Sequence, residues 1–205
     1  MPNDRDHNVS RNPDWDTPRL RSALLMATEL HGAQRRKGTD IPYLSHLFAV
    51  ASLVMEAGGD EDEVIAALLH DAAEDCGGEA TLARIREHFG ANVAAIVAGC
   101  SDTFEEPKPP WRQRKERYLE HLAGVSRSTL LVSAADKLHN ARAILDDYRH
   151  HGESLWERFR GGRDGTLWYY RELLNRYLDL AAPARLVKEL ERVVDTLEML
   201  ARTPR

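Results

Sequence analysis

Apolar residues recur at helical spacing along almost the whole chain, and this periodicity restricts the fold more than any other feature. In the first periodic segment the apolar positions Leu20, Ala23, Leu24 and Ala27 are three or four residues apart, which places them on one face of a helix. No stretch of alternating apolar and polar residues has a useful length for a sheet strand. We therefore expect an all-α protein.

Helix boundaries follow from glycine, proline and capping residues. Thr17 is a predicted N-cap with Pro18 at the first helical position. Loops are expected at residues 37–43, 101–110 and 160–165, where glycine or proline interrupts the pattern. The expected helices cover residues 17–36, 45–57, 61–76, 80–89, 91–100, 111–124, 127–152, 166–182 and 184–202. Residues 1–16 are read as a flexible arm and 17–205 as one domain.

Composition excludes several classes of function. The net charge of −5 gives no support to binding a nucleic acid polymer or an acidic membrane surface. No apolar run approaches the ~18 residues of a membrane span, and the polar N-terminus lacks the apolar core of a signal peptide. Cys76 and Cys100 are too few for a disulfide framework and lack zinc-ligand spacing. We expect a cytoplasmic protein with reduced thiols.

One stretch, "LLHDAAEDC", gathers ionisable side chains at the end of an apolar helical pattern. Glu74 is four residues from His70 and three from Asp71, and Asp75 is four from Asp71, so the group shares one side of the helix. Carboxylates this close repel one another, and burial raises the cost. A divalent metal ion would supply the missing positive charge.

Further metal ligands must come from other helices. His46 lies at the start of the second expected helix, and Asp136 lies in an otherwise apolar stretch where an unpartnered carboxylate is costly. With His70 and Asp71 they form a set of two imidazoles and two carboxylates, which suits manganese, iron, zinc or cobalt better than calcium or magnesium. Taken alone, His70 also fits a hydrogen-bonded core histidine.

The ordered set "YLSH", "LLHDAAED" and "AADKLHNAR" resembles the HD-domain superfamily of metal-dependent phosphohydrolases. More narrowly, "QRRKGTDIPYLSH" and the spacing of the three segments resemble the small stand-alone alarmone hydrolases of the RelA/SpoT type. The resemblance covers about residues 23–149, the predicted metal core, with a weaker similarity in the C-terminal helices at 166–202. It implies a helical bundle of roughly ten helices.

The resemblance also implies a reaction and its residues. His46, His70, Asp71 and Asp136 would bind one divalent ion, usually Mn²⁺. Glu74 and Asp75 would position and deprotonate water. The family reaction removes the 3′-pyrophosphate from guanosine tetra- or pentaphosphate (ppGpp or pppGpp) and returns GDP or GTP. Such chemistry needs a Lewis acid and cations near the transferred group.

Candidate substrate-binding residues lie in two further segments. By resemblance, Arg36 and Lys37 would lie against the guanine base and Tyr43 would shape the pocket, although a basic helix end is also favourable without a ligand. Asn140 would contact the ribose or phosphate, unless its role is a structural hydrogen bond. Lys137 and Arg142 flank it and are further candidates.

The segment "EEPKPPWRQRKERY" forms a second basic patch. Lys108 is a candidate substrate-binding residue, and by resemblance Arg114 and Lys115 would bind the distal phosphates. The alternative is an exposed helix with ion pairs four residues apart, such as Arg112 with Glu116.

Other functions stay open at this point. The nearest alternative is an HD-domain phosphohydrolase, for example a phosphomonoesterase, that acts on another nucleotide. A second is a non-catalytic nucleotide-binding module, although binding alone does not require the Glu74–Asp75 pair. The final apolar stripe from Leu186 to Leu197 is expected to be core or the contact of a homodimer.

Overall fold

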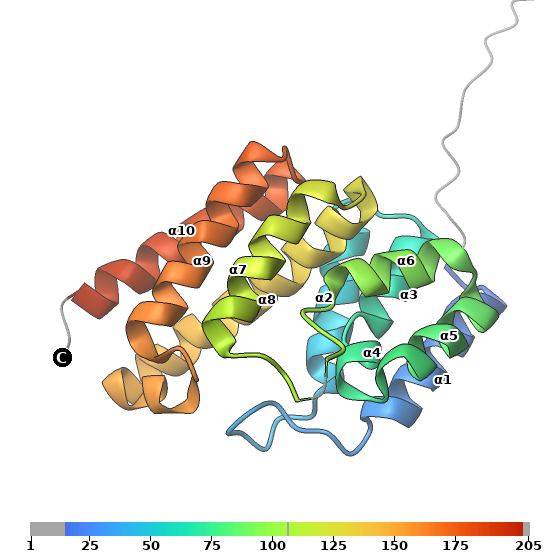
Figure 1. Ribbon diagram of the computed structural model, residues 1–205, viewed down its shortest axis with the longest axis horizontal. Coiled ribbons are helices and arrows are strands. Elements are labelled where there is room, and N and C mark those ends of the chain that lie inside the picture. The colour runs from blue at the N-terminus through green and yellow to red at the C-terminus, as the bar shows by residue number, and fades with distance from the viewer. Residues whose placement is uncertain (1–14, 106, 203–205) are drawn as a thin grey trace, which may run out of the picture.

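The computed structural model describes residues 15–105 and 107–202, and in these ranges the chain forms ten α-helices and no β-strand (Figure 1). The all-α prediction is therefore confirmed. Apart from Trp15 and Asp16, the predicted N-terminal arm lies outside the described residues. The helices are Pro18–His31 (α1), Leu44–Glu56 (α2), Glu61–Leu69 (α3), Ala72–Asp75 (α4), Gly78–Phe89 (α5), Ala91–Cys100 (α6), Trp111–His121 (α7), Arg127–His151 (α8), Gly162–Asp179 (α9) and Ala184–Arg202 (α10), with 3₁₀ turns at Leu122–Gly124 (η1) and Gly152–Arg158 (η2).

Side-chain caps fix the start of the first and third helices. The Thr17 hydroxyl accepts a hydrogen bond from the Leu20 N–H at 3.0 Å, which confirms the predicted cap of α1. Asp60 and Glu63 form a reciprocal capping box at the start of α3, in which each side chain accepts from the other residue's backbone N–H. These caps satisfy N–H groups that have no partner inside the helix.

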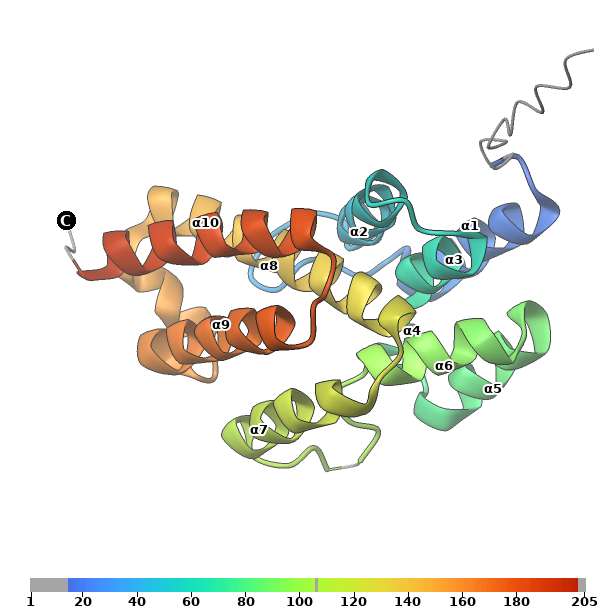
Figure 2. The same ribbon diagram turned by 90° about the horizontal axis from the view of Figure 1, so that it is seen from above.

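Helix α8 is the central element of the bundle. Its 25 residues run between the group formed by α1–α6 and the pair α9 and α10, as Figure 2 shows. One part of α8 packs against α2, α3 and α6, and another packs against α9, α10 and η2. A side chain on α8 can therefore meet residues from both ends of the sequence.

The predicted apolar stripe of α10 is buried within a single chain. Leu186, Leu190, Val194 and Leu197 are at most 2% exposed, and α10 packs against α8 and α9. Their burial contributes to one hydrophobic core that extends from α1 to α10. The stripe is core, and a homodimer stays a prediction that this packing does not address.

Two predicted helix boundaries are wrong. The first helix ends at His31 rather than near residue 36, because the chain folds back after Gly32 and the Arg36 N–H donates to the Ile41 carbonyl at 2.9 Å. The segment 160–165 was expected to be a flexible loop, but α9 already begins at Gly162. Its glycines allow close packing, since a Cβ at Gly161 would lie 2.6 Å from the ring of Trp111.

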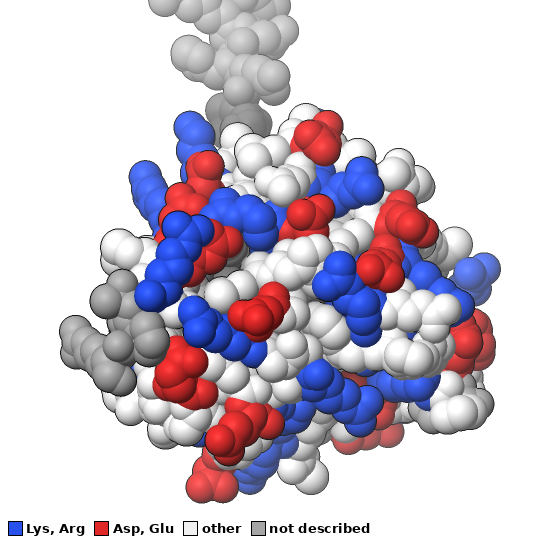
Figure 3. All heavy atoms as spheres, turned by 60° about the vertical axis from the view of Figure 1, so that its left-hand side comes forward, with Lys and Arg blue, Asp and Glu red and all other residues white. Residues whose placement is uncertain are grey.

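Surface charge is mixed on the face that Figure 3 shows, where Lys and Arg side chains are interspersed with Asp and Glu. This distribution agrees with the modest net charge of −5. Among the described residues, no helix combines the length and the apolar character needed to cross a membrane. Cys76 and Cys100 are both free thiols.

Candidate metal centre

His70 and Asp71 lie at a break between two helices, not within one continuous helix as predicted. Helix α3 ends at Leu69, Asp71 has φ −97° and ψ −4°, and α4 resumes at Ala72. On an unbroken helix two neighbouring side chains diverge by about 100°. The break turns Asp71 so that its Oδ2 lies 3.0 Å from Nε2 of His70.

The four predicted ligands converge on one point between three segments. Ligand atoms of His46, His70 and Asp136 all lie within 4.8 Å of one another, and all three residues are buried. Nε2 of His46 lies 3.2 Å from Nε2 of His70, 3.3 Å from Oδ1 of Asp136 and 3.6 Å from Oδ2 of Asp71. The start of α2, the α3–α4 break and the middle of α8 each contribute to the cluster.

Hydrogen bonds outside the cluster orient both histidines. Nδ1 of His70 donates to the carbonyl of Ala67 at 2.8 Å, which leaves Nε2 as a lone-pair donor to a cation. Nδ1 of His46 lies 2.8 Å from Nδ1 of His139. Burial, followed by the neighbouring His46 and Arg36, lowers the pKa of His139 to about 4, so its ring is neutral at pH 7 and can accept a hydrogen bond from Nδ1–H of His46.

Both carboxylates of the cluster are held ionised. Burial opposes ionisation of Asp136, but Lys137 at 2.5 Å and the two histidines hold the pKa of Asp136 well below its usual range. Burial likewise opposes ionisation of Asp71, and His70 and His46 outweigh it to lower the Asp71 pKa. Two deprotonated carboxylates and two oriented imidazoles fit a divalent transition metal ion.

The predicted catalytic pair lies directly after the break, at the end of α4. Glu74 accepts hydrogen bonds from the Asp102 backbone N–H at 2.9 Å and from Nζ of Lys108 at 3.1 Å. Oδ2 of Asp75 accepts from the Gln34 side-chain amide at 2.9 Å. Both carboxylates are therefore fixed by partners from other segments, beside the cluster to which Asp71 belongs.

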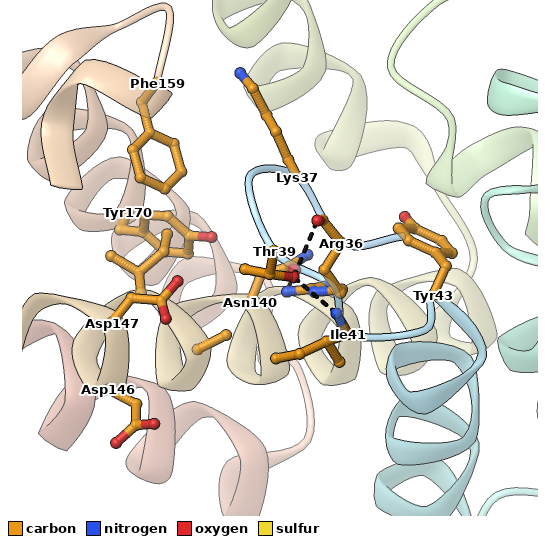
Figure 4. A pocket seen from close by; sticks show the side chains of 12 residues that line it. Arg36, Lys37, Thr39, Ile41, Tyr43, Asn140, Asp146, Asp147, Phe159 and Tyr170 are labelled. Atoms are coloured by element: carbon orange, nitrogen blue, oxygen red, sulfur yellow. Dashed lines mark hydrogen bonds between the residues drawn. The ribbon is translucent and has the colours of Figure 1, made fainter. Parts of the chain in front are cut away.

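A cavity of about 330 Å³ adjoins the cluster, and Figure 4 shows its lining. Four predicted substrate-binding residues line it: Arg36, Lys37, Tyr43 and Asn140. Asn140 links the cavity to the cluster, because its Nδ2 donates to Oδ1 of Asp136 and its Oδ1 accepts from Nη2 of Arg36 at 2.9 Å. The Tyr43 hydroxyl donates to Oδ2 of Asp71.

Lys137 and Arg142 lie in different surroundings from these four residues. The Lys137 side chain is 15% exposed, and its ammonium pairs with Asp136 and lies 5.1 Å from the ring centre of Tyr118. Arg142 lies 3.7 Å from a carboxylate oxygen of Glu189 on α10. Neither side chain lines the cavity beside the cluster.

The cations of the second basic patch are already paired with carboxylates. Arg114 and Lys115 on α7 both bond Oδ2 of Asp102, the lysine at 3.1 Å, and Lys108 pairs with Glu74. The predicted ion pair between Arg112 and Glu116 forms at 2.7 Å, and the Arg112 guanidinium also lies over the Trp168 ring. The patch is thus a charge network around Asp102 and Glu74.

Two residues in contact with the site were not predicted from the sequence. His139 follows Asp136 by three positions and shares its helical face, so the spacing could have indicated it. Asp102 lies in a proline-rich loop, and no periodicity marks it. Its carboxylate is buried, and Oδ1 has no hydrogen-bond partner among the described residues.

Comparison with known proteins places this geometry in context. A family model described as HD domain matches residues 23–167. The guanosine-3′,5′-bis(diphosphate) 3′-pyrophosphohydrolase MESH1 of Xenopus tropicalis is 38% identical over 132 residues, which span 63% of this chain and 71% of that protein. The bifunctional (p)ppGpp synthase/hydrolase SpoT of Escherichia coli K12 is 33% identical over 138 residues, which span only 19% of SpoT.

Solved structures share the fold. A structure described as a metazoan ortholog of SpoT that hydrolyzes ppGpp superposes with a TM-score of 0.76 at 24% identity, covering 92% of this chain and 100% of the other. The protein lmo0812 of Listeria monocytogenes EGD-e superposes with a TM-score of 0.64 at 31% identity, covering 78% and 97%. The expected helical bundle is confirmed.

Proposed function

Since this chain belongs to the HD-domain family, we propose that it is a metal-dependent hydrolase that removes the 3′-pyrophosphate from guanosine 3′,5′-bis(diphosphate). The products are GDP and pyrophosphate, and the pentaphosphate gives GTP. One observation carries the proposal: two imidazoles and two carboxylates from three segments, His46, His70, Asp71 and Asp136, meet beside a cavity that has cations at its edge.

The donor set fits a resident metal ion. His46, His70 and Asp136, with Asp71 beside them, would hold the ion, and we propose Mn²⁺, because mixed imidazole and carboxylate ligands suit it. When bound, the ion supplies a Lewis acid for a phosphoryl oxygen and lowers the pKa of water. A cytoplasmic location and a homodimer stay predictions from the sequence.

The remaining residues of the site bind substrate and move protons. Glu74 and Asp75 accept the proton of the attacking water. Their partners Lys108 and Gln34 hold them in place until substrate arrives. Lys108 then offsets charge that develops on the pyrophosphoryl group as it is transferred to water and the 3′-oxygen of GDP leaves.

The cavity orients the nucleotide. Arg36 and Lys37 attract the phosphorylated ligand, and Asn140 connects the Arg36 side of the cavity to Asp136. Tyr43 keeps Asp71 aligned through its hydroxyl. Burial and then the Asp71 charge raise the pKa of Tyr43, so this hydroxyl stays a hydrogen-bond donor at neutral pH.

The proposal is tested by incubating Mn²⁺-loaded protein with guanosine 3′,5′-bis(diphosphate) and measuring pyrophosphate and orthophosphate separately. We expect pyrophosphate and GDP. Asp71→Asn should lose both metal content and turnover, whereas the matched variant Glu74→Gln should retain the metal and lose turnover.

Other results would contradict the proposal. Orthophosphate as the product would favour a phosphomonoesterase of the same family. If the protein binds the nucleotide and Glu74→Gln changes only the binding affinity, a non-catalytic binding module would be favoured.

A further inference from the structure

One face of α8 extends from the metal centre along the cavity. Asp136, Asn140, Ile144 and Asp147 are spaced four, four and three residues apart, so they lie on the same side of the helix. At a rise of about 1.5 Å per residue, the eleven steps from Asp136 to Asp147 span about 16 Å. A ligand whose phosphates lie at the metal centre would place its other end near Asp147.

This far end of the cavity suits a flat ring. Ile144, Phe159 and Tyr170 provide apolar and aromatic surface, and Ile41 and Thr39 line the opposite wall. Figure 4 shows Tyr170 and Asp147 on one side of the gap and Arg36 and Thr39 on the other. Aromatic and aliphatic walls of this kind favour a nucleobase, whose faces are apolar and whose edge is polar.

Asp147 provides a hydrogen-bond acceptor at this end of the cavity. Its side chain is 34% exposed and forms an ion pair with Nη1 of Arg158 at 3.5 Å, without the geometry of a hydrogen bond. Within the described ranges, no hydrogen bond engages its carboxylate. The preceding residue, Asp146, also borders the cavity, but its side chain is 71% exposed, twice as much as that of Asp147, and lies farther from Tyr170 and Arg36 in Figure 4. An ionised carboxylate can only accept hydrogen bonds, so its ligand must present donors.

We propose that Asp147 is the residue that selects guanine. Its two carboxylate oxygens accept hydrogen bonds from N1–H and from the exocyclic 2-amino group, which are adjacent donors on the base. Adenine presents an unprotonated N1 at the same place and is rejected by repulsion between lone pairs. This inference rests on the proposed function and adds the group that determines base specificity at the same site.

Replacing Asp147 by asparagine should abolish the preference for guanine over xanthine. The amide oxygen of the variant still accepts from N1–H, but its NH₂ group donates, and so it suits the 2-oxo group of xanthine rather than the amino group of guanine. The experiment compares pyrophosphate release from guanosine and xanthosine 3′,5′-bis(diphosphate) by the wild type and Asp147→Asn. The control is Asp146→Asn, which makes the same charge change one residue away.

We expect the wild type to prefer guanosine by about tenfold or more in kcat/KM, the size expected for a hydrogen bond to a charged group. Asp147→Asn should lower this ratio by a similar factor, mainly through KM, because Asp147 lies far from the metal centre. The ratio for Asp146→Asn should equal that of the wild type. An increase in kcat/KM for the xanthosine substrate relative to the guanosine substrate cannot arise from misfolding, because misfolding lowers the activity toward both.

Each contrary outcome has a separate meaning. A wild type that cleaves both nucleotides equally well, or an Asp147→Asn variant with the wild-type ratio, would overturn base selection by Asp147 and leave the hydrolase intact. If Asp147→Asn fails to fold, Asp147→Ala is measured in its place: its preference for guanosine should also fall, and a wild-type ratio would overturn the proposal. A wild type that releases pyrophosphate from neither nucleotide would overturn the proposed function and this inference together.

Discussion

The contact between Gly161 and Trp111 allows a sharp prediction about how α7 is held in place. Gly161 has φ −82° and ψ −6°, a conformation that alanine adopts freely, so Gly161→Ala introduces no backbone strain. The new Cβ would lie 2.6, 2.8 and 2.9 Å from three carbon atoms of the Trp111 ring. The effect of this substitution is therefore steric.

The size of the effect follows from these distances. Carbon atoms in contact prefer about 3.5–4.0 Å, so the indole ring must move by about 1 Å. Overpacking of this kind costs about 1–3 kcal/mol of unfolding free energy. In a chain of this length, each kcal/mol corresponds to about 2–4 °C in Tm, so we expect a decrease of about 2–12 °C.

The displacement should also reach the candidate catalytic carboxylate. Trp111 is the first residue of α7, and Arg114 and Lys115 on the same helix bond Asp102. The backbone N–H of Asp102 in turn donates to Glu74. We therefore expect Gly161→Ala to release pyrophosphate more slowly than the wild type at a temperature at which both are folded.

Thermal unfolding followed by far-ultraviolet circular dichroism measures the decrease in Tm of Gly161→Ala. The control is Gly124→Ala, because a Cβ at Gly124 meets no heavy atom within 4 Å and its φ is not in the left-handed region. If the two variants have the same Tm, the Trp111 contact does not constrain α7, and the reasoning is refuted.

Three further predictions address the metal centre and the buried thiol. Chelation of Mn²⁺ should lower Tm, and adding the ion at about 100 times its Kd should restore about 2.7 kcal/mol of stability; an unchanged Tm would argue against a folded-state metal site. His139→Leu should weaken Mn²⁺ binding about 10- to 100-fold in calorimetry, because His46 loses its hydrogen-bond acceptor. His139→Asn should retain part of the affinity, because its side-chain oxygen can accept the same bond; if His139→Leu binds Mn²⁺ as tightly as the wild type, His139 does not orient His46. Burial raises the pKa of the Cys100 thiol, so the unfolded chain loses this proton first as pH rises, and the free energy of unfolding should fall above about pH 9. The fall with pH should be shallower in Cys100→Ala; identical slopes in the two proteins would contradict a raised pKa of Cys100.

The side chains that meet in the candidate metal cluster could be indicated from the sequence because part of the information is local. His70, Asp71, Glu74 and Asp75 are neighbours in the chain, and Asp136 is conspicuous in an apolar helix. Periodicity also predicted the α10 stripe, which the structure buries. The roles of these residues in a reaction stay proposals.

The partner of the α7 cations Arg114 and Lys115 could not be predicted from the local sequence. Arg114 and Lys115 were predicted as ligands of the distal phosphates because related hydrolases carry an Arg-Lys pair at this place in the order. The structure pairs both with Asp102, which comes from the preceding loop and is buried by the packing of α7. A proline-rich loop has no periodicity that would indicate such a partner.

The sequence by itself determined the helical content and the cap at Thr17, because both depend on residues a few positions apart. It also indicated the side chains of the candidate metal cluster, because ionisable residues are conspicuous in apolar helices. The tertiary structure alone decided that Asp71 leaves the helix to face His70, that His139 meets His46 across 93 residues, and that Asp147 faces the same cavity as Arg36. Such contacts depend on how helices cross and pack, and those angles are set by the whole core rather than by any local pattern.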